Sequence, residues 1–89
     1  MDQSYLEVTF LRGKPFAAYL SLPRQPDDHS ARTEKAGEGL VIDYADDGRP
    51  IGLEIISPKT VTLAAINAIL ERLGQATLEA TDFAPLAAA

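Results

Sequence analysis

In residues 39–56, GLVIDYADDGRPIGLEII, two apolar runs flank an Asp-Gly pair. Gly48 readily adopts the positive φ that tight hairpin turns require, and the preceding Asp47 tolerates such a backbone better than most residues. Apolar side chains alternate on both sides of this turn and share one face: Leu40, Ile42, Tyr44, Ile51, Leu53 and Ile55. The stretch therefore predicts a β-hairpin, with strands at residues 39–45 and 51–57.

Three more strands are expected upstream of this hairpin. Residues 5–11 and 16–22 alternate in the same way and are joined by a turn at Gly13 and Pro15, so they form a second hairpin. A surface loop with two prolines follows. Residues 31–36 are mostly polar, and we expect them to form an edge strand whose charges discourage further pairing.

The hydrophobic period changes from two to about 3.6 after residue 60. Apolar residues at helical spacing predict an amphipathic helix over residues 61–73: Leu63, Ile66, Ile69, Leu70 and Leu73. Thr60 or Thr62 can cap its start, and Gly74 can end it. In the tail, residues 75–89, we expect a docking segment with a short helical turn beginning near Thr81 or Asp82.

These elements predict an α+β fold: an antiparallel β-meander of four to five strands followed by one C-terminal amphipathic helix. The 89 residues are enough for one compact core but not for a second. We therefore expect a single small domain that spans residues 1–89.

The composition excludes several classes of protein. Thirteen acidic residues against eight basic ones give a net charge of −5, which disfavours a nucleic-acid partner because phosphate binding needs clustered Lys and Arg. Apolar runs reach only four or five residues, so no membrane association is expected. The chain has no cysteine, and its polar start resembles no signal or transit peptide, so we expect a cytoplasmic location.

Asp43 and Glu54 are predicted to project from one face of the central hairpin. Two adjacent carboxylates can share a proton or a metal and support acid–base chemistry. They can equally be solvated acids, contact a partner's Arg or Lys, or pair with Arg32 or Arg49 of this chain. We favour the structural or interfacial reading over the catalytic one.

Residues 43–54 also match the register of a twelve-residue calcium loop. The match fails because Ala45 supplies no oxygen and the flanking segments alternate as strands, whereas an EF-hand needs helices. No metal site and no cofactor are therefore expected. If a divalent ion binds at all, the candidate ligands are Asp43, Asp47 and Glu54.

No catalytic residue is predicted. His29 is the single histidine and lies in a polar loop, where one ring and two adjacent acids seldom make a metal site. No nucleophile motif or phosphate-binding loop is present in the sequence. The chain is therefore not expected to be an enzyme.

Apolar side chains on the second face of the strands point to a protein partner. A single helix can cover only one face of the sheet, which leaves Leu11, Tyr19, Val41 and Ile56 partly exposed in a monomer. We expect most strand aromatics to lie in the core: Tyr5, Phe10, Phe16, Tyr19 and Tyr44. The interaction candidates are Tyr19, Val41, Ile56, Arg32 and Arg49.

Residues 31–59, ARTEKAGEGLVIDYADDGRPIGLEIISPK, carry a resemblance to a known family. The Arg-Thr-Glu element, the Gly-Leu-Val-Ile-Asp-Tyr strand, the Asp-Gly turn and the Gly-Leu-Glu-Ile strand resemble the bacterial domain of unknown function 2283 family, over residues 16–59. The resemblance implies a small β-rich domain without assigned activity or binding residues. Some relatives are encoded beside small toxin-like proteins, which implies an antitoxin or accessory role.

The expected function is a non-enzymatic protein-interaction module. It would act as a homodimer, through its sheet faces, strand edges or helix, or as an antitoxin-like partner of a small basic protein, or both. The alternative is a domain that binds a small ligand or a divalent metal through Asp43, Asp47 and Glu54. A third class is an enzyme that uses Asp43 and Glu54 as an acid–base pair.

Overall fold

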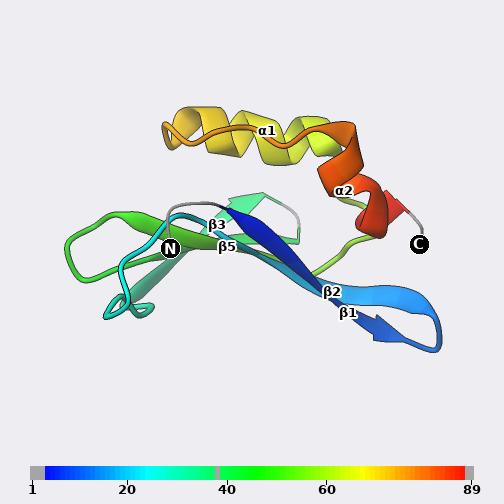
Figure 1. The fold of residues 1–89 in the computed structure, drawn as a ribbon, viewed down its shortest axis with the longest axis horizontal. Helices are drawn as coiled ribbons and strands as arrows, with labels where there is room; N and C mark the ends of the chain where they lie inside the picture. The colour runs from blue at the N-terminus through cyan, green and yellow to red at the C-terminus, as the bar shows by residue number, and fades with distance from the viewer. Residues whose placement is uncertain (1–3, 38, 88–89) are drawn as a thin grey trace.

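A single antiparallel sheet and two helices on one of its faces make up the fold in a computed structural model, which describes residues 4–37 and 39–87 (Figure 1). The strands are β1 (Tyr5–Leu11), β2 (Lys14–Ser21), β3 (Arg32–Gly37), β4 (Leu40–Tyr44) and β5 (Pro50–Ile55). The helices are α1 (Leu63–Arg72) and α2 (Ala80–Ala87). The predicted α+β class is confirmed.

The strand order is β1-β2-β5-β4-β3. The predicted meander, in which each strand pairs with the next along the chain, is therefore wrong. After β2 the chain crosses the sheet, and β3 and β4 lead back so that β5 pairs with β2. Burial explains the arrangement: β5 carries Ile51, Leu53 and Ile55 in the core and needs neighbours on both sides. β3 is charged and exposed, so it can lie at the edge of the sheet with a neighbour on one side only.

The core lies between the sheet and the helices. Its fully buried side chains come from three strands, the segments next to them and both helices: Leu20, Leu22, Ile42, Ile51, Leu53, Ile55, Ile66, Leu70 and Leu86. The helices cover one face only (Figure 1). On the other face the edge strands β1 and β3 are mostly exposed, whereas Tyr19 and Glu54 on the central strands are half-buried.

Most strand aromatics are not in this core, contrary to prediction. Tyr44 is buried and Tyr19 half-buried, whereas Tyr5, Phe10 and Phe16 are 44%, 52% and 60% exposed. The turn end of the β1–β2 hairpin projects beyond the helices, which leaves its side chains uncovered (Figure 1). A bulge pairs Phe10 with Pro15 and leaves Phe16 outside the alternation.

Helix α1 lies within the predicted range of residues 61–73 but begins two residues later and ends one residue earlier, and Thr62, one of the two predicted caps, caps it. Oγ1 of Thr62 accepts a hydrogen bond from the backbone N–H of Ala65 at 3.1 Å, which caps the first turn. Gly74 follows the last turn with φ +72°, and the N–H of Gln75 then reaches the carbonyl of Leu70 at 2.8 Å.

The second helix, α2, corrects the expectation of one C-terminal helix. The carboxylate of Asp82 accepts a hydrogen bond from the N–H of Glu79 at 3.0 Å, which stabilises the start of α2. The side-chain amide of Asn67 forms two hydrogen bonds with the backbone of Leu78: it donates to the carbonyl at 3.0 Å and accepts from the N–H at 2.8 Å. The tail therefore packs on its own chain.

Candidate functional site

The uncovered sheet face carries a row of five side chains, four of them polar, that crosses all five strands. Strand register places Tyr19 between Glu7 on β1 and Glu54 on β5, and continues the row to Val41 and Lys35. The adjacent row holds Ser21, Gly52, Asp43 and Thr33 in the same order across the sheet. Residues that are far apart in the sequence thus meet on one surface.

The half-buried Tyr19 and the buried Asp43 are hydrogen-bonded on this surface. The hydroxyl of Tyr19 donates to Oδ2 of Asp43 at 2.9 Å and accepts a hydrogen bond from Nη2 of Arg24 at 3.1 Å. The same nitrogen of Arg24 also donates to the carbonyl of Ile51. Asp43 is only 6% exposed, and burial raises the pKa of Tyr19 above its ordinary value.

Gly52 makes room for the Tyr19 ring. A Cβ at this position would overlap with Oη and Cζ of Tyr19. Glycine in a central strand therefore allows the aromatic ring to pass close to β5 and its hydroxyl to reach Asp43 on β4. The hydrogen-bonded contact from β2 to β4, across β5, depends on this missing side chain.

Glu54 lies beside this buried pair. Asp43 raises the pKa of Glu54, because the protonated carboxyl group of Glu54 can donate a hydrogen bond to it; burial of Glu54 and the negative charge of Asp43 act in the same direction. A hydrogen bond between two carboxyl groups requires one proton. Oδ1 of Asp43 is buried and has no hydrogen-bond partner among the described residues. Negative charge is thus disfavoured at Glu54 unless a cation approaches.

A groove of about 360 Å³ runs beside Glu54 on the same face. Its acidic groups are Glu7 and Glu54, and its apolar walls include Phe16, Ala17 and Ile56. Ile56 is 58% exposed. The groove therefore combines carboxylates with an uncovered hydrocarbon surface.

The structure brings Asp43 and Glu54 together as predicted, and it places Tyr19 and Val41 on the same face. Asp47 is elsewhere: it lies at the hairpin turn, where its carboxylate binds Nε of Arg49 at 2.7 Å. The proposed trio of metal ligands is therefore not assembled. Within residues 4–37 and 39–87, no three His, Asp or Glu side chains are arranged to hold a metal ion.

The two arginine candidates are engaged away from Glu54. Arg49 binds both carboxylate oxygens of Asp28, at 2.7 and 3.0 Å, and thereby lowers the pKa of Asp28. Arg32 stacks over the ring of Tyr44, with its guanidinium carbon 4.1 Å from the ring centre. Neither arginine approaches the Asp43–Glu54 pair as the sequence suggested.

Two residues of the site were missed from sequence. Gly52 carried a usable signal, because a glycine inside a predicted central strand indicates close approach by another group. Arg24 carried none, since it lies in a proline-rich loop and reaches Tyr19 only after β2 and β5 have paired.

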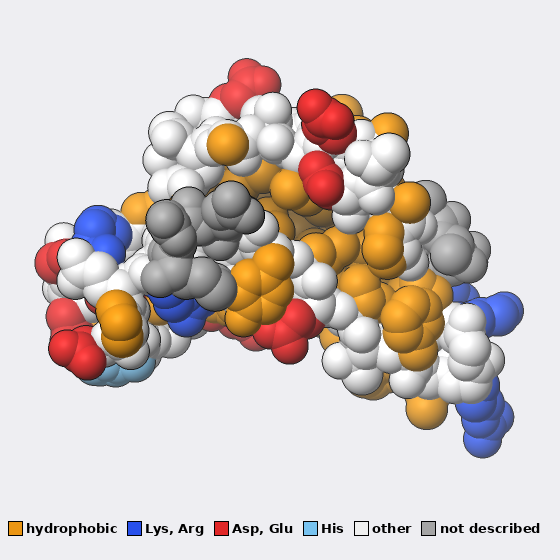
Figure 2. All heavy atoms as spheres, viewed as in Figure 1, with side chains coloured by type: hydrophobic (Ala, Val, Ile, Leu, Met, Phe, Trp, Pro, Cys, Tyr) orange, Lys and Arg blue, Asp and Glu red, His pale blue; other side chains and the backbone are white. Residues whose placement is uncertain are grey.

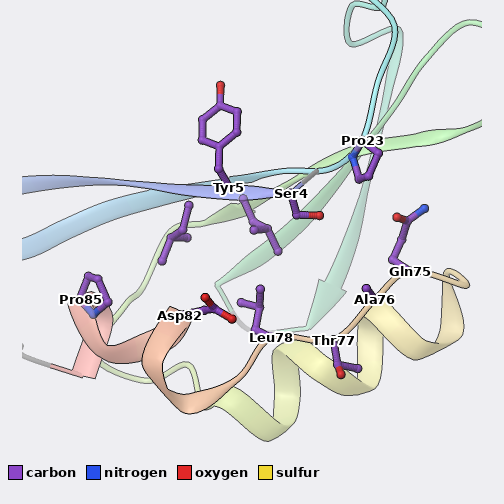
Figure 3. Close-up of a pocket in the computed structure, with 11 residues that line it drawn as sticks. Ser4, Tyr5, Pro23, Gln75, Ala76, Thr77, Leu78, Asp82 and Pro85 are labelled. Atoms are coloured by element: carbon purple, nitrogen blue, oxygen red, sulfur yellow. The ribbon is translucent and has the colours of Figure 1, made fainter. Parts of the chain in front are cut away.

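A second cavity, of about 620 Å³, lies on the other side of the sheet between β1 and the segment that precedes α2 (Figure 3). Leu78 points from the helical side toward the strands, whereas the ring of Tyr5 points away from the cavity (Figure 3). Oδ2 of Asp82 already accepts the N–H of Glu79. The polar residues that line the cavity include Ser4, Gln75, Thr77 and Asp82.

Residues 17–57 match the family described as "Protein of unknown function (DUF2283)", which confirms the resemblance read from the sequence. The matched segment runs from β2 to just beyond β5 and includes Tyr19, Gly52, Asp43 and Glu54. No match to the chain is found among curated proteins or among solved structures. Neither described helix is long and apolar enough to cross a membrane.

Proposed function

We propose that the chain is a non-enzymatic protein-interaction module that binds a small basic protein on its uncovered sheet face. An arginine or lysine of the partner would enter the groove over β2 and place its cation against Glu54. An antitoxin-like accessory role, implied by the family resemblance, is one biological form of such binding. The proposal needs no bound metal or cofactor.

The shape of the groove supports a long basic side chain as the occupant. Arg and Lys bury their hydrocarbon stems on apolar surface while the charged head remains near polar groups. Phe16 and Ile56 supply the apolar wall, and Glu54 and Glu7 supply carboxylates beside it. The net charge of −5 adds long-range attraction for a basic partner.

The Asp43–Glu54 pair is the observation that carries the proposal. Asp43 raises the pKa of Glu54 because two neighbouring carboxylates disfavour double ionisation. A partner's cation beside Glu54 would favour the ionised form, so binding should release a proton. Affinity should therefore increase as the pH rises through the pKa of free Glu54.

A labelled hexa-arginine peptide, measured by fluorescence anisotropy, tests the proposal. We expect binding that Glu54→Gln weakens about two- to fivefold, the range of one partly exposed ion pair. Glu71→Gln removes the same charge from the exposed surface of α1 and should change affinity much less. A hexa-citrulline peptide, which keeps the shape without the charge, should not bind.

Two results would contradict the proposal. Equal loss of affinity in Glu54→Gln and Glu71→Gln would show that the peptide senses only the net charge of the protein. Affinity that does not rise with pH in the wild-type chain would show that the cation does not lie near Glu54.

A further inference from the structure

Strand β1 is an unprotected edge of the sheet. It pairs with β2 alone, so its outer backbone groups have no partner strand among the described residues. Of its seven residues, Glu7 is the only charged one, and three large side chains are exposed: Tyr5, Phe10 and Leu11. Figure 2 shows hydrophobic side chains gathered on the side of the molecule that β1 occupies.

The opposite edge of the sheet has the features that normally prevent pairing. Strand β3 carries Arg32, Glu34 and Lys35 within six residues, and its register with β4 is irregular after Lys35. Charged side chains and bulges are the usual protections of edge strands. β1 has only the charge of Glu7, and the bulge of its hairpin, at Phe16, lies on β2.

We propose that β1 is a dimerisation edge, at which β1 of a second copy pairs antiparallel about a two-fold axis at Val8. This register places Leu6 opposite Phe10 of the second copy and Tyr5 opposite Leu11. Directly opposite residues in an antiparallel pair point to the same face. The three exposed apolar side chains of one copy thus gain apolar neighbours.

The charge of Glu7, the one charged residue of β1, favours this register. With Val8 on the axis, Glu7 faces Thr9 of the second copy and not the second Glu7. A shift that centred the pair on Glu7 would place two carboxylates directly opposite each other, which is unfavourable. The axis is perpendicular to the sheet, so the open faces of both copies lie on one side of a ten-stranded sheet. This dimer does not depend on a basic partner.

Pairing of seven residues buries less than a standard interface, so we expect a dimer that dissociates on dilution. Analytical ultracentrifugation over a wide concentration range should show a rise in mass from 9.6 kDa toward twice that value.

Thr9 is exposed and lies opposite Glu7 of the second copy, so a charge introduced at this position tests the proposed register. Thr9→Lys places two Lys–Glu7 pairs across the axis, and Thr9→Glu places two carboxylate pairs there.

At about 0.2–1 kcal/mol for each cross-strand pair, Thr9→Lys should tighten the dimer about two- to thirtyfold, and Thr9→Glu should weaken it by a similar factor. The controls are Thr33→Lys and Thr33→Glu on the β3 edge, which should leave the dissociation constant unchanged. Thermal melting confirms that each variant is folded. The proposal is wrong if the chain stays monomeric at all concentrations, or if the Thr33 variants shift the equilibrium and the Thr9 variants do not.

Discussion

At the scale of single residues, Gly52 and Tyr19 determine how the open face is built. The ring occupies the space that any other residue at position 52 would fill, and its hydroxyl supplies a hydrogen bond to the buried Asp43. A buried carboxylate without its donor is costly. The glycine therefore acts through Tyr19, and its effect on stability should depend on that ring.

Gly52→Ala should lower the free energy of unfolding by about 1–3 kcal/mol, because the methyl group displaces Tyr19 and leaves Asp43 without its donor. Urea denaturation measures the change. In a Tyr19→Ala background the same substitution should cost much less, since no ring remains to be displaced. An equal penalty in both backgrounds would mean that the close approach does not matter.

Glu54 makes the stability of the chain depend on pH. Its pKa is higher in the folded protein than its ordinary value of 4.5, so the folded chain holds this proton more tightly than the unfolded chain. The stabilisation is present below the ordinary value and is lost as the pH rises through the folded-state pKa. Ionisation of Glu54 thus destabilises the free protein near neutral pH.

Glu54→Gln should therefore melt at a higher temperature than the wild type at neutral pH, because its amide stays uncharged and can donate to Asp43. Below pH 4.5 the two proteins should melt at similar temperatures. Thermal melts across this range test the difference, with Glu71→Gln as the charge-matched control. A Glu54→Gln protein that is less stable than the wild type at neutral pH contradicts this account.

At the scale of elements, the hairpins and α1 could be predicted because their signals are local. The Asp-Gly turn, the alternation around it and the caps at Thr62 and Gly74 act within a few residues. Helix α2 was harder to predict, because it has eight residues and contains Pro85, and among its described side chains Phe83 and Leu86 are the ones that pack on the core. Its position depends on Asn67, which holds Leu78 from a different helix.

Leu86 anchors α2 in the core, where it is 1% exposed. Leu86→Ala should lower the free energy of unfolding by about 2–5 kcal/mol, the usual range for a buried leucine. Thr81→Ala, at an exposed position of the same helix, should have little effect. If urea denaturation gives similar values for both variants, α2 does not contribute to the core as described.

At the scale of the whole molecule, the strand order was the part that sequence could not provide. Pairing of β2 with β5 is non-local, and no turn motif encodes it. The order decides the site, because it places Tyr19 beside Glu54 and Gly52 between Tyr19 and Asp43. Sequence could therefore predict the Asp43–Glu54 pair within one hairpin, but not its contacts with β2 and Arg24.

The same order gives the chain one covered face and one open face. Both helices lie over one face (Figure 1). That face holds the core, and the open face holds Tyr19, Glu54 and the groove over β2. The apolar core and the proposed binding groove therefore lie on opposite sides of a single sheet. The central claim is that the carboxylate of Glu54 on the open face receives a cation from a basic partner.

The most direct test is an NMR titration that follows the side-chain carboxyl carbon of Glu54 with pH, in the free protein and with hexa-arginine peptide. We predict a pKa above 4.5 in the free protein and a lower value when the peptide is bound, because the cation stabilises the ionised form. A pKa of Glu54 that the bound peptide leaves unchanged would contradict the proposed role of this face.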